Sequence, residues 1–99
     1  MATGQGTAVI DFGAAPGTNT ATVTVTGQAG ITAPSYVEAW FMGNDSTADH
    51  NAYEHKHILP QMVKLSADNI VAGTGFDIAA TALELRLTGT IKCRYVWST

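Results

Sequence analysis

The sequence predicts a small all-β domain, an antiparallel β-sandwich or jelly-roll-like barrel of about seven to nine short strands. Apolar and polar residues alternate with a period of two along most of the chain, as in half-buried strands. Gly, Pro and Asn interrupt this alternation roughly every eight to twelve residues, as turns do. Because 99 residues suffice for one domain, we expect a single β-sandwich over 1–99, with 1–6 as a loose N-terminal arm.

The first half of the chain contains a strictly alternating segment. In segment 20–26 every second residue is threonine, and Ala21, Val23 and Val25 occupy the positions between. Such a segment predicts a strand with a threonine-lined outer face and an apolar inner face, because β-branched residues suit strands. Strands are predicted over 7–12, 20–26 and 35–42, with a shorter strand over 28–32.

The middle of the chain holds a polar loop at 43–54, the longest stretch without strand-like alternation. Segments 55–59 and 61–65 after it are predicted as strands on either side of Pro60. A proline at this place implies an edge position or a bulge, because proline lacks the N–H that a sheet requires. Two further short strands are predicted at 68–72 and 76–80.

The last part of the chain predicts a β-hairpin. Leucines alternate with polar residues over 83–87, Gly89 provides a turn, and alternation resumes over 90–97. Cys93 lies on the apolar face of the second of these strands, so we expect a small buried side chain. As the sequence holds one cysteine, neither an internal disulfide nor a cysteine pair for zinc is available.

Charge and hydropathy exclude several kinds of partner. The formal net charge is −3, which argues against nucleic acid. Charged residues make up 13%, below the roughly 25% usual in soluble domains, so we expect other protein chains to cover part of the surface. No apolar run approaches the roughly 20 residues that cross a bilayer, and 1–6 do not resemble a signal peptide. We expect no membrane partner and no export from the cytoplasm where the chain is made.

All three histidines lie between positions 50 and 57, beside several carboxylates. We expect this polar segment to order the loop or to contact a neighbouring subunit, with no cofactor and no catalytic residue. A metal site is the alternative: His55 and His57 would share one face of a strand, His50 could fold back, and Asp49 or Glu54 could add a carboxylate. The spacing fits no known metalloenzyme motif. The histidines could also form a pH-sensitive contact.

Tyr36 and Trp40 share one face of the strand predicted at 35–42, together with Glu38 and Met42. Aromatic side chains with a polar tip are more often core or interface residues than sugar-binding platforms, so we expect this face to be covered. The predicted interface residues are Tyr36, Trp40, Asp49, His50, Tyr53, Glu54, His55 and His57.

Five segments resemble a group of small proteins encoded among the structural genes of tailed bacteriophages. They are Val-Ile-Asp-Phe-Gly at 9–13, Pro-Gly at 16–17, Ala-Thr-Val-Thr-Val-Thr-Gly-Gln at 21–28, Ser-Tyr-Val-Glu-Ala-Trp at 35–40, and Thr-Ala-Asp-His-Asn at 47–51 continuing to Glu54-His55. The resemblance covers most of the chain and implies a virion component without enzymatic activity.

The resemblance favours a decoration or cement protein bound in many copies to the head, with the capsid surface favoured over the tail. Its partners would be the major capsid protein or other virion proteins, and copies of itself in a homo-oligomer such as a trimer. Two alternatives stay open. One is a tail tip or fibre module that contacts a host receptor, and the other is a small metal-dependent protein that uses His50, His55 and His57.

Overall fold

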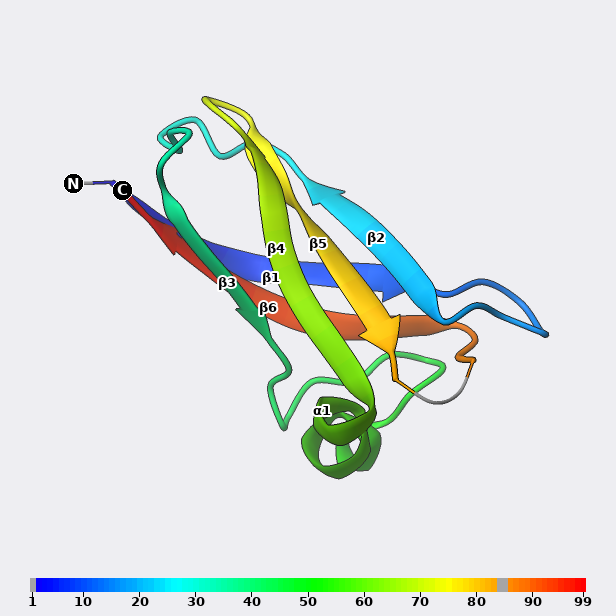
Figure 1. The fold of residues 1–99 in the computed structure, drawn as a ribbon. Coiled ribbons are helices and arrows are strands. Elements are labelled where there is room, and N and C mark those ends of the chain that lie inside the picture. The colour runs from blue at the N-terminus through cyan, green and yellow to red at the C-terminus, as the bar shows by residue number, and fades with distance from the viewer. Residues whose placement is uncertain (1, 84–85) are drawn as a thin grey trace.

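The computed structural model describes residues 2–83 and 86–99, which form two facing antiparallel sheets of three strands each (Figure 1). One sheet has the order β1-β6-β3 and the other the order β2-β5-β4. The elements are β1 (Thr3–Asp11), β2 (Thr20–Val25), β3 (Tyr36–Trp40), a π-helical turn η1 (Glu54–Ile58), α1 (Leu59–Met62), β4 (Val63–Val71), β5 (Gly75–Ala82) and β6 (Thr90–Ser98).

The predicted all-β class and antiparallel pairing are confirmed, but the number of strands is not. The described residues form six strands, fewer than the seven to nine predicted and fewer than the eight of a jelly roll. Two of the missing strands are those expected at 28–32 and 68–72. Segment 28–32 forms turns, in which the Ile31 N–H donates to the Gln28 carbonyl, and segment 68–72 mostly continues β4.

The core lies between the two sheets and is built by the predicted alternation. Every second residue of the two central strands, β5 and β6, is buried. On β6 the inward side chains include Ile91 and Cys93, both fully buried, while Lys92 and Arg94 point outward. Burying one large aliphatic or aromatic side chain contributes about 1.5–3 kcal/mol, so these central strands supply much of the stability.

Residues 3–6 were expected in a loose arm, and that prediction is wrong. They belong to β1, which pairs with β6 along its length. A Cβ on Gly4 would overlap the Trp97 indole, and one on Gly6 would lie 2.5 Å from the Tyr95 hydroxyl. The two glycines therefore let these large rings lie directly against the β1 backbone. Here a glycine within a strand indicates that a large side chain packs directly on the backbone.

Gln28 forms hydrogen bonds with the polar groups of the same two rings. The Trp97 indole N–H donates to Gln28 Oε1 at 2.8 Å, and Gln28 Nε2 donates to the Tyr95 hydroxyl at 3.3 Å. Both aromatic polar groups are thus satisfied although their rings are almost completely buried.

The strand expected at 55–59 is replaced by helix, and the one expected at 61–65 is a strand only from Val63 onward. Residues 54–62 form η1 and α1, and β4 begins only at Val63. Pro60 lies in the first turn of α1, directly after η1, and the helical segment forms although proline has no N–H to donate. Figure 1 shows α1 at one end of the two layers, next to the start of β4.

The hairpin expected between 83–87 and 90–97 is also wrong, although β6 itself is confirmed. β6 pairs with β1 on one edge and, over 94–98, with β3 on the other, and the side chains of Asp49 and His55 occupy the rest of that second edge. Leu87 forms only an isolated bridge with Thr18, and Leu83 is exposed. Residues 84 and 85 lie outside the described part of the chain.

Replacing Gly4 with alanine is expected to lower the free energy of unfolding by about 1–3 kcal/mol, because the added methyl would displace the Trp97 ring. Urea denaturation followed by Trp fluorescence measures the change. The matched control is Gln5→Ala, an exposed position beside it in β1, which should stay within about 0.5 kcal/mol. Equal stability of the Gly4 variant and the wild type would contradict this packing.

Candidate functional site

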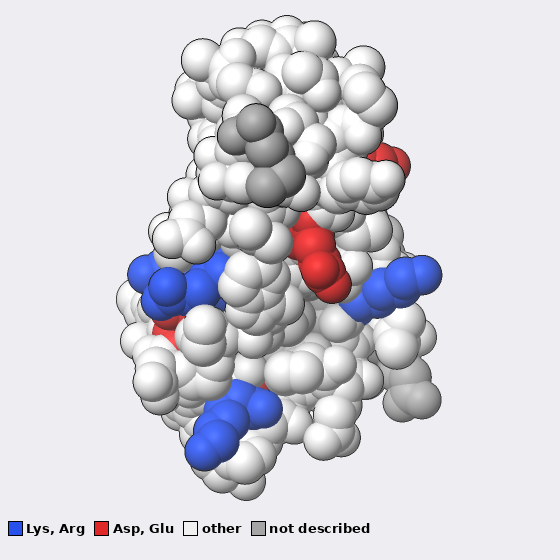
Figure 2. Space-filling model, turned by 90° about the vertical axis from the view of Figure 1, so that its left-hand side faces the viewer, with Lys and Arg blue, Asp and Glu red and all other residues white. Residues whose placement is uncertain are grey.

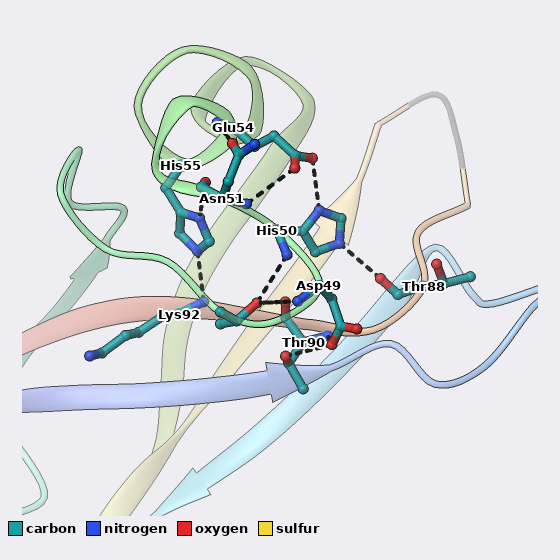
Figure 3. Close-up of polar contacts among 9 residues, drawn as sticks. Asp49, His50, Asn51, Glu54, His55, Thr88, Thr90 and Lys92 are labelled. Carbon is teal, nitrogen blue, oxygen red and sulfur yellow. Dashed lines mark hydrogen bonds and ion pairs between the residues drawn. The ribbon is translucent and has the colours of Figure 1, made fainter.

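The polar segment after β3 binds the edge of β6 at the place where β3 ends. β3 stops at Trp40, which lies opposite Arg94, so Lys92 and Thr90 on the same edge of β6 have no strand beside them. Side chains take over their hydrogen bonds (Figure 3). The Lys92 N–H donates to His55 Nε2 at 3.0 Å, and the Thr90 N–H donates to Asp49 Oδ2 at 2.8 Å.

The same segment also satisfies other polar groups of Thr90. The Thr90 hydroxyl donates to Asp49 Oδ2 at 2.8 Å, and the Thr47 hydroxyl donates to the Thr90 carbonyl at 2.6 Å. These hydrogen bonds from Thr90 hold the pKa of Asp49 below its ordinary value. The loop is therefore a side-chain replacement for a missing length of strand.

His55 is fully buried and has a defined tautomer. Its Nε2 accepts a hydrogen bond from the Lys92 N–H, so the proton must lie on Nδ1, which donates to the Asn51 carbonyl at 2.9 Å. Its ring meets Phe41 edge to face, with centroids 6.1 Å apart. His55 is thus a neutral structural histidine that joins η1 to β6.

His50 is held by two acceptors. Its Nδ1 lies 2.9 Å from Glu54 Oε2, and its Nε2 lies 2.9 Å from the Thr88 carbonyl oxygen. Because a carboxylate and a carbonyl only accept, both ring nitrogens donate and the ring is an imidazolium. Burial lowers the pKa of His50, but hydrogen bonds to Glu54 and Thr88 outweigh it and raise this pKa above the ordinary value.

Asp45 and Arg94 make a two-point ion pair beside this network. Arg94 Nε and Nη2 donate to the two Asp45 carboxylate oxygens at 3.0 and 2.8 Å. The hydrogen bonds from Arg94 hold the pKa of Asp45 below its usual range, against the opposing effect of burial. Arg94 projects from the outer face of β6, so this pair anchors the start of the polar segment to the sheet.

The three histidines do not converge as a metal site would require. His50 and His55 use both ring nitrogens inside the chain, and His57 is exposed and lies against Tyr53, with ring centroids 4.8 Å apart. The prediction that His55 and His57 share one face of a strand is wrong, because both belong to η1. Within 2–83 and 86–99, no three His, Cys, Asp or Glu side chains form a group that could hold a metal ion.

The predicted interface residues therefore divide into two sets. Asp49, His50, Glu54 and His55 are engaged in contacts within the chain, which agrees with a loop-ordering role. The other four, Tyr36, Trp40, Tyr53 and His57, are exposed, and Tyr36 reaches 77% exposure. The structure brings the first set together around the start of β6 and leaves the aromatic residues available at the surface.

Tyr36 and Trp40 belong to an apolar surface on the outside of the β1–β6–β3 sheet. We call the exposed side chains of Tyr36, Trp40, Met42 and Val96 the aromatic face. Val96 lies opposite Glu38, between the two aromatic positions of β3. Sequence reasoning did not single out Val96, although the alternation of β6 places it outward between buried Tyr95 and Trp97.

Two shallow hollows border the aromatic face. One of about 440 Å³ is lined by Tyr36, Val37, Glu38, Val96, Trp97 and Ser98. The other, of about 320 Å³, is lined by Gln5, Gly6, Thr7, Trp40, Met42, Arg94 and Tyr95. On the side of the molecule shown in Figure 2, charged side chains gather over the lower half, and the upper half is almost free of them.

The chain matches no protein-family model, no curated protein and no solved structure. None of the helices in the described residues is long and apolar enough to traverse a bilayer.

His50→Gln is expected to destabilise the protein more at pH 5.5 than at pH 8.5. A pKa that is raised by folding adds stability that is complete below the unfolded pKa and is lost as the pH rises through the folded pKa. We expect a loss of about 1.5–3 kcal/mol at pH 5.5, from hydrogen bonds to a charged group, and less at pH 8.5. Urea denaturation at both pH values measures this difference.

The control for that experiment is His57→Gln, because the exposed His57 ring lies outside the network of His50, Glu54 and Thr88. An effect of His50→Gln that is the same at both pH values would contradict a charged His50.

His55→Ala is expected to lower the free energy of unfolding by about 2–4 kcal/mol, because it removes a fully buried ring and leaves the Lys92 N–H without its acceptor. Chemical denaturation gives the loss, and amide hydrogen exchange at Lys92 should become faster. Lys56→Ala, at the exposed neighbouring position, should change stability by less than about 0.5 kcal/mol.

Proposed function

We propose that the protein is a structural component of a tailed-bacteriophage virion, a decoration or cement protein that binds the head shell in many copies. The observation that carries the proposal is the aromatic face, four apolar side chains exposed together on the outside of a sheet. Tyr, Trp and Met are enriched in protein–protein interfaces, and a β-sheet face offers a broad contact surface. The resemblance of the sequence to phage structural proteins supplies the virion as the assembly.

The internal use of the polar segment supports a binding role over a catalytic one. His50, His55 and Asp49 have their hydrogen-bonding groups occupied by Glu54, Thr88, Asn51, Lys92 and Thr90. These contacts fix the end of the β1–β6–β3 sheet, the same sheet that carries the aromatic face. The polar side chains of this segment then stabilise the sheet that carries the binding surface. A metal-dependent role of His50 and His55 has less support, because their ring nitrogens already have partners in the chain.

Cement proteins act through many simultaneous contacts. A single copy that buries a few exposed apolar side chains gains on the order of 25 cal/mol for each Å² of apolar area removed from water. Attachment at repeated positions of a shell links neighbouring subunits, so modest individual contacts together oppose its dissociation.

A second candidate is a tail tip or fibre module that contacts a host-surface glycan. Tyr36 and Trp40 lie four residues apart on one face of β3, with Glu38 between them and a hollow of about 440 Å³ beside Tyr36. Two exposed rings with adjacent polar groups could stack on sugar units. This candidate uses the same face for a different ligand.

Immunogold labelling of virions from the phage that carries the gene separates the two candidates. Gold over the head supports a decoration protein, and gold confined to the tail tip or fibres supports the receptor-binding module. Virions without label at either place would contradict both.

Replacing both Tyr36 and Trp40 with alanine is expected to reduce the number of copies retained on isolated heads at least tenfold. Truncating a central aromatic contact commonly costs more than about 1–2 kcal/mol, and 1.4 kcal/mol is a factor of ten in affinity. Quantitative gel analysis of heads incubated with each purified variant measures retention. Val71→Ala is the control, since Val71 is 52% exposed on the opposite sheet and should leave retention unchanged.

A further inference from the structure

One edge of the β1–β6–β3 sheet offers unpaired backbone groups. The Phe12 N–H donates to the Gly89 carbonyl and the Thr99 N–H to the Ala2 carbonyl, so the even-numbered residues of β1 direct their backbone groups toward β6. The N–H and C=O groups of the odd-numbered residues must then point away from β6. These residues are Thr3, Gln5, Thr7 and Val9, all exposed, and no hydrogen bond joins their backbone groups to any other described residue.

The β1 edge lacks the features that usually prevent strand addition. Between Thr3 and Val9 it contains no charged residue, no proline and no bulge. β2 lies beside β1 in the opposite sheet but forms no ladder with it. An uncharged, regular edge of this kind is a template for another extended strand.

Two of the other three edges, β4 and β3, are protected in different ways, and the third, β2, has six residues against the nine of β1. β4 carries Lys64 and Asp68 and has a register shift after Asp68, where Asn69 adopts a positive φ of 56°. β3 lies next to β4, and its inward residue Ala39 lines a hollow with Pro60 and Leu65. β1 is therefore the longest edge that lacks such protection.

We propose that β1 pairs antiparallel with β1 of a second copy of this chain, joining two three-stranded sheets into one six-stranded sheet. A two-fold axis places the same segment opposite itself, and β1 tolerates this because no like charges meet between Thr3 and Val9. A register that sets Gln5 opposite Thr7 of the second copy also sets Gly6 opposite Gly6, where side-chain bulk is absent.

The pairing has a consequence for attachment. Directly opposite residues of antiparallel strands project from the same face, so both aromatic faces would lie on one side of the joined sheet. The dimer itself does not depend on the proposed function, because it uses the β1 edge and leaves Tyr36 and Trp40 free. If the proposed function holds as well, each dimer binds the shell at two points.

Light scattering on the full chain, over a concentration series up to about 100 μM, tests the pairing by mass action. We expect the mass to rise from 10.4 kDa toward twice that value. The double variant Gln5→Lys with Thr7→Lys should remain monomeric, since its new charges would oppose each other across the strands. The Gln5→Glu with Thr7→Glu variant should behave likewise, and mixing the two should restore a dimer.

Thr22→Lys with Ser66→Lys is the matched control, because it adds the same charge at exposed strand positions of the other sheet and should still dimerise. Thr7→Pro is a second test that adds no charge: it removes one outward N–H and leaves the ladder with β6 intact. It should be monomeric, with thermal unfolding showing that each variant is folded.

A wild-type chain that stays at 10.4 kDa, a trimer, or a dimer unaffected by the β1 variants would overturn the proposal. Measuring how much of the monomeric Lys variant is retained on heads distinguishes a failure of the strand pairing from a failure of the proposed function. Binding that depends on Tyr36 and Trp40 and persists in that monomer supports attachment without strand pairing.

Discussion

The difference in length between β3 and β6 is the constraint on which the segment between β3 and β4 depends. β6 continues beyond the last paired residue of β3, so the backbone groups of Lys92 and Thr90 need other partners. Leaving a buried N–H unsatisfied costs about 1–3 kcal/mol. The chain meets this requirement with His55 and Asp49, and the π-helical turn η1 is the element that brings His55 into reach.

Much of the sheet structure could be predicted from the sequence because alternation is a local property. The segment 20–26 contains β2 with exposed threonines and an inward apolar face, and β5 and β6 bury every second residue as expected. Cys93 is completely buried, which agrees with its prediction as a small core side chain, and burial raises the pKa of its thiol to about 11. These features need only the residue itself and its neighbours in the chain.

The features that could not be predicted depend on distant partners. His55 and His57 have strand-like spacing, but a helical turn lets His55 donate to the Asn51 carbonyl and accept from the Lys92 N–H. The leucines of 83–87 alternate like a hairpin strand, yet the start of β6 binds β1 on one edge and the side chains of Asp49 and His55 on the other. At the candidate site, the sequence predicts the polar and the aromatic residues as one interface, and only the contacts within the structure show which of them remain at the surface.

Because Cys93 is buried, the native protein exposes no reactive thiol. Its sulfur is inaccessible and its thiolate form is scarce at neutral pH, so maleimides and similar electrophiles will find no reactive site in the native protein. A cysteine introduced at an exposed position such as Thr24 would then be the single point of modification. Fluorophores or spin probes can consequently be attached one per molecule while the natural core stays intact.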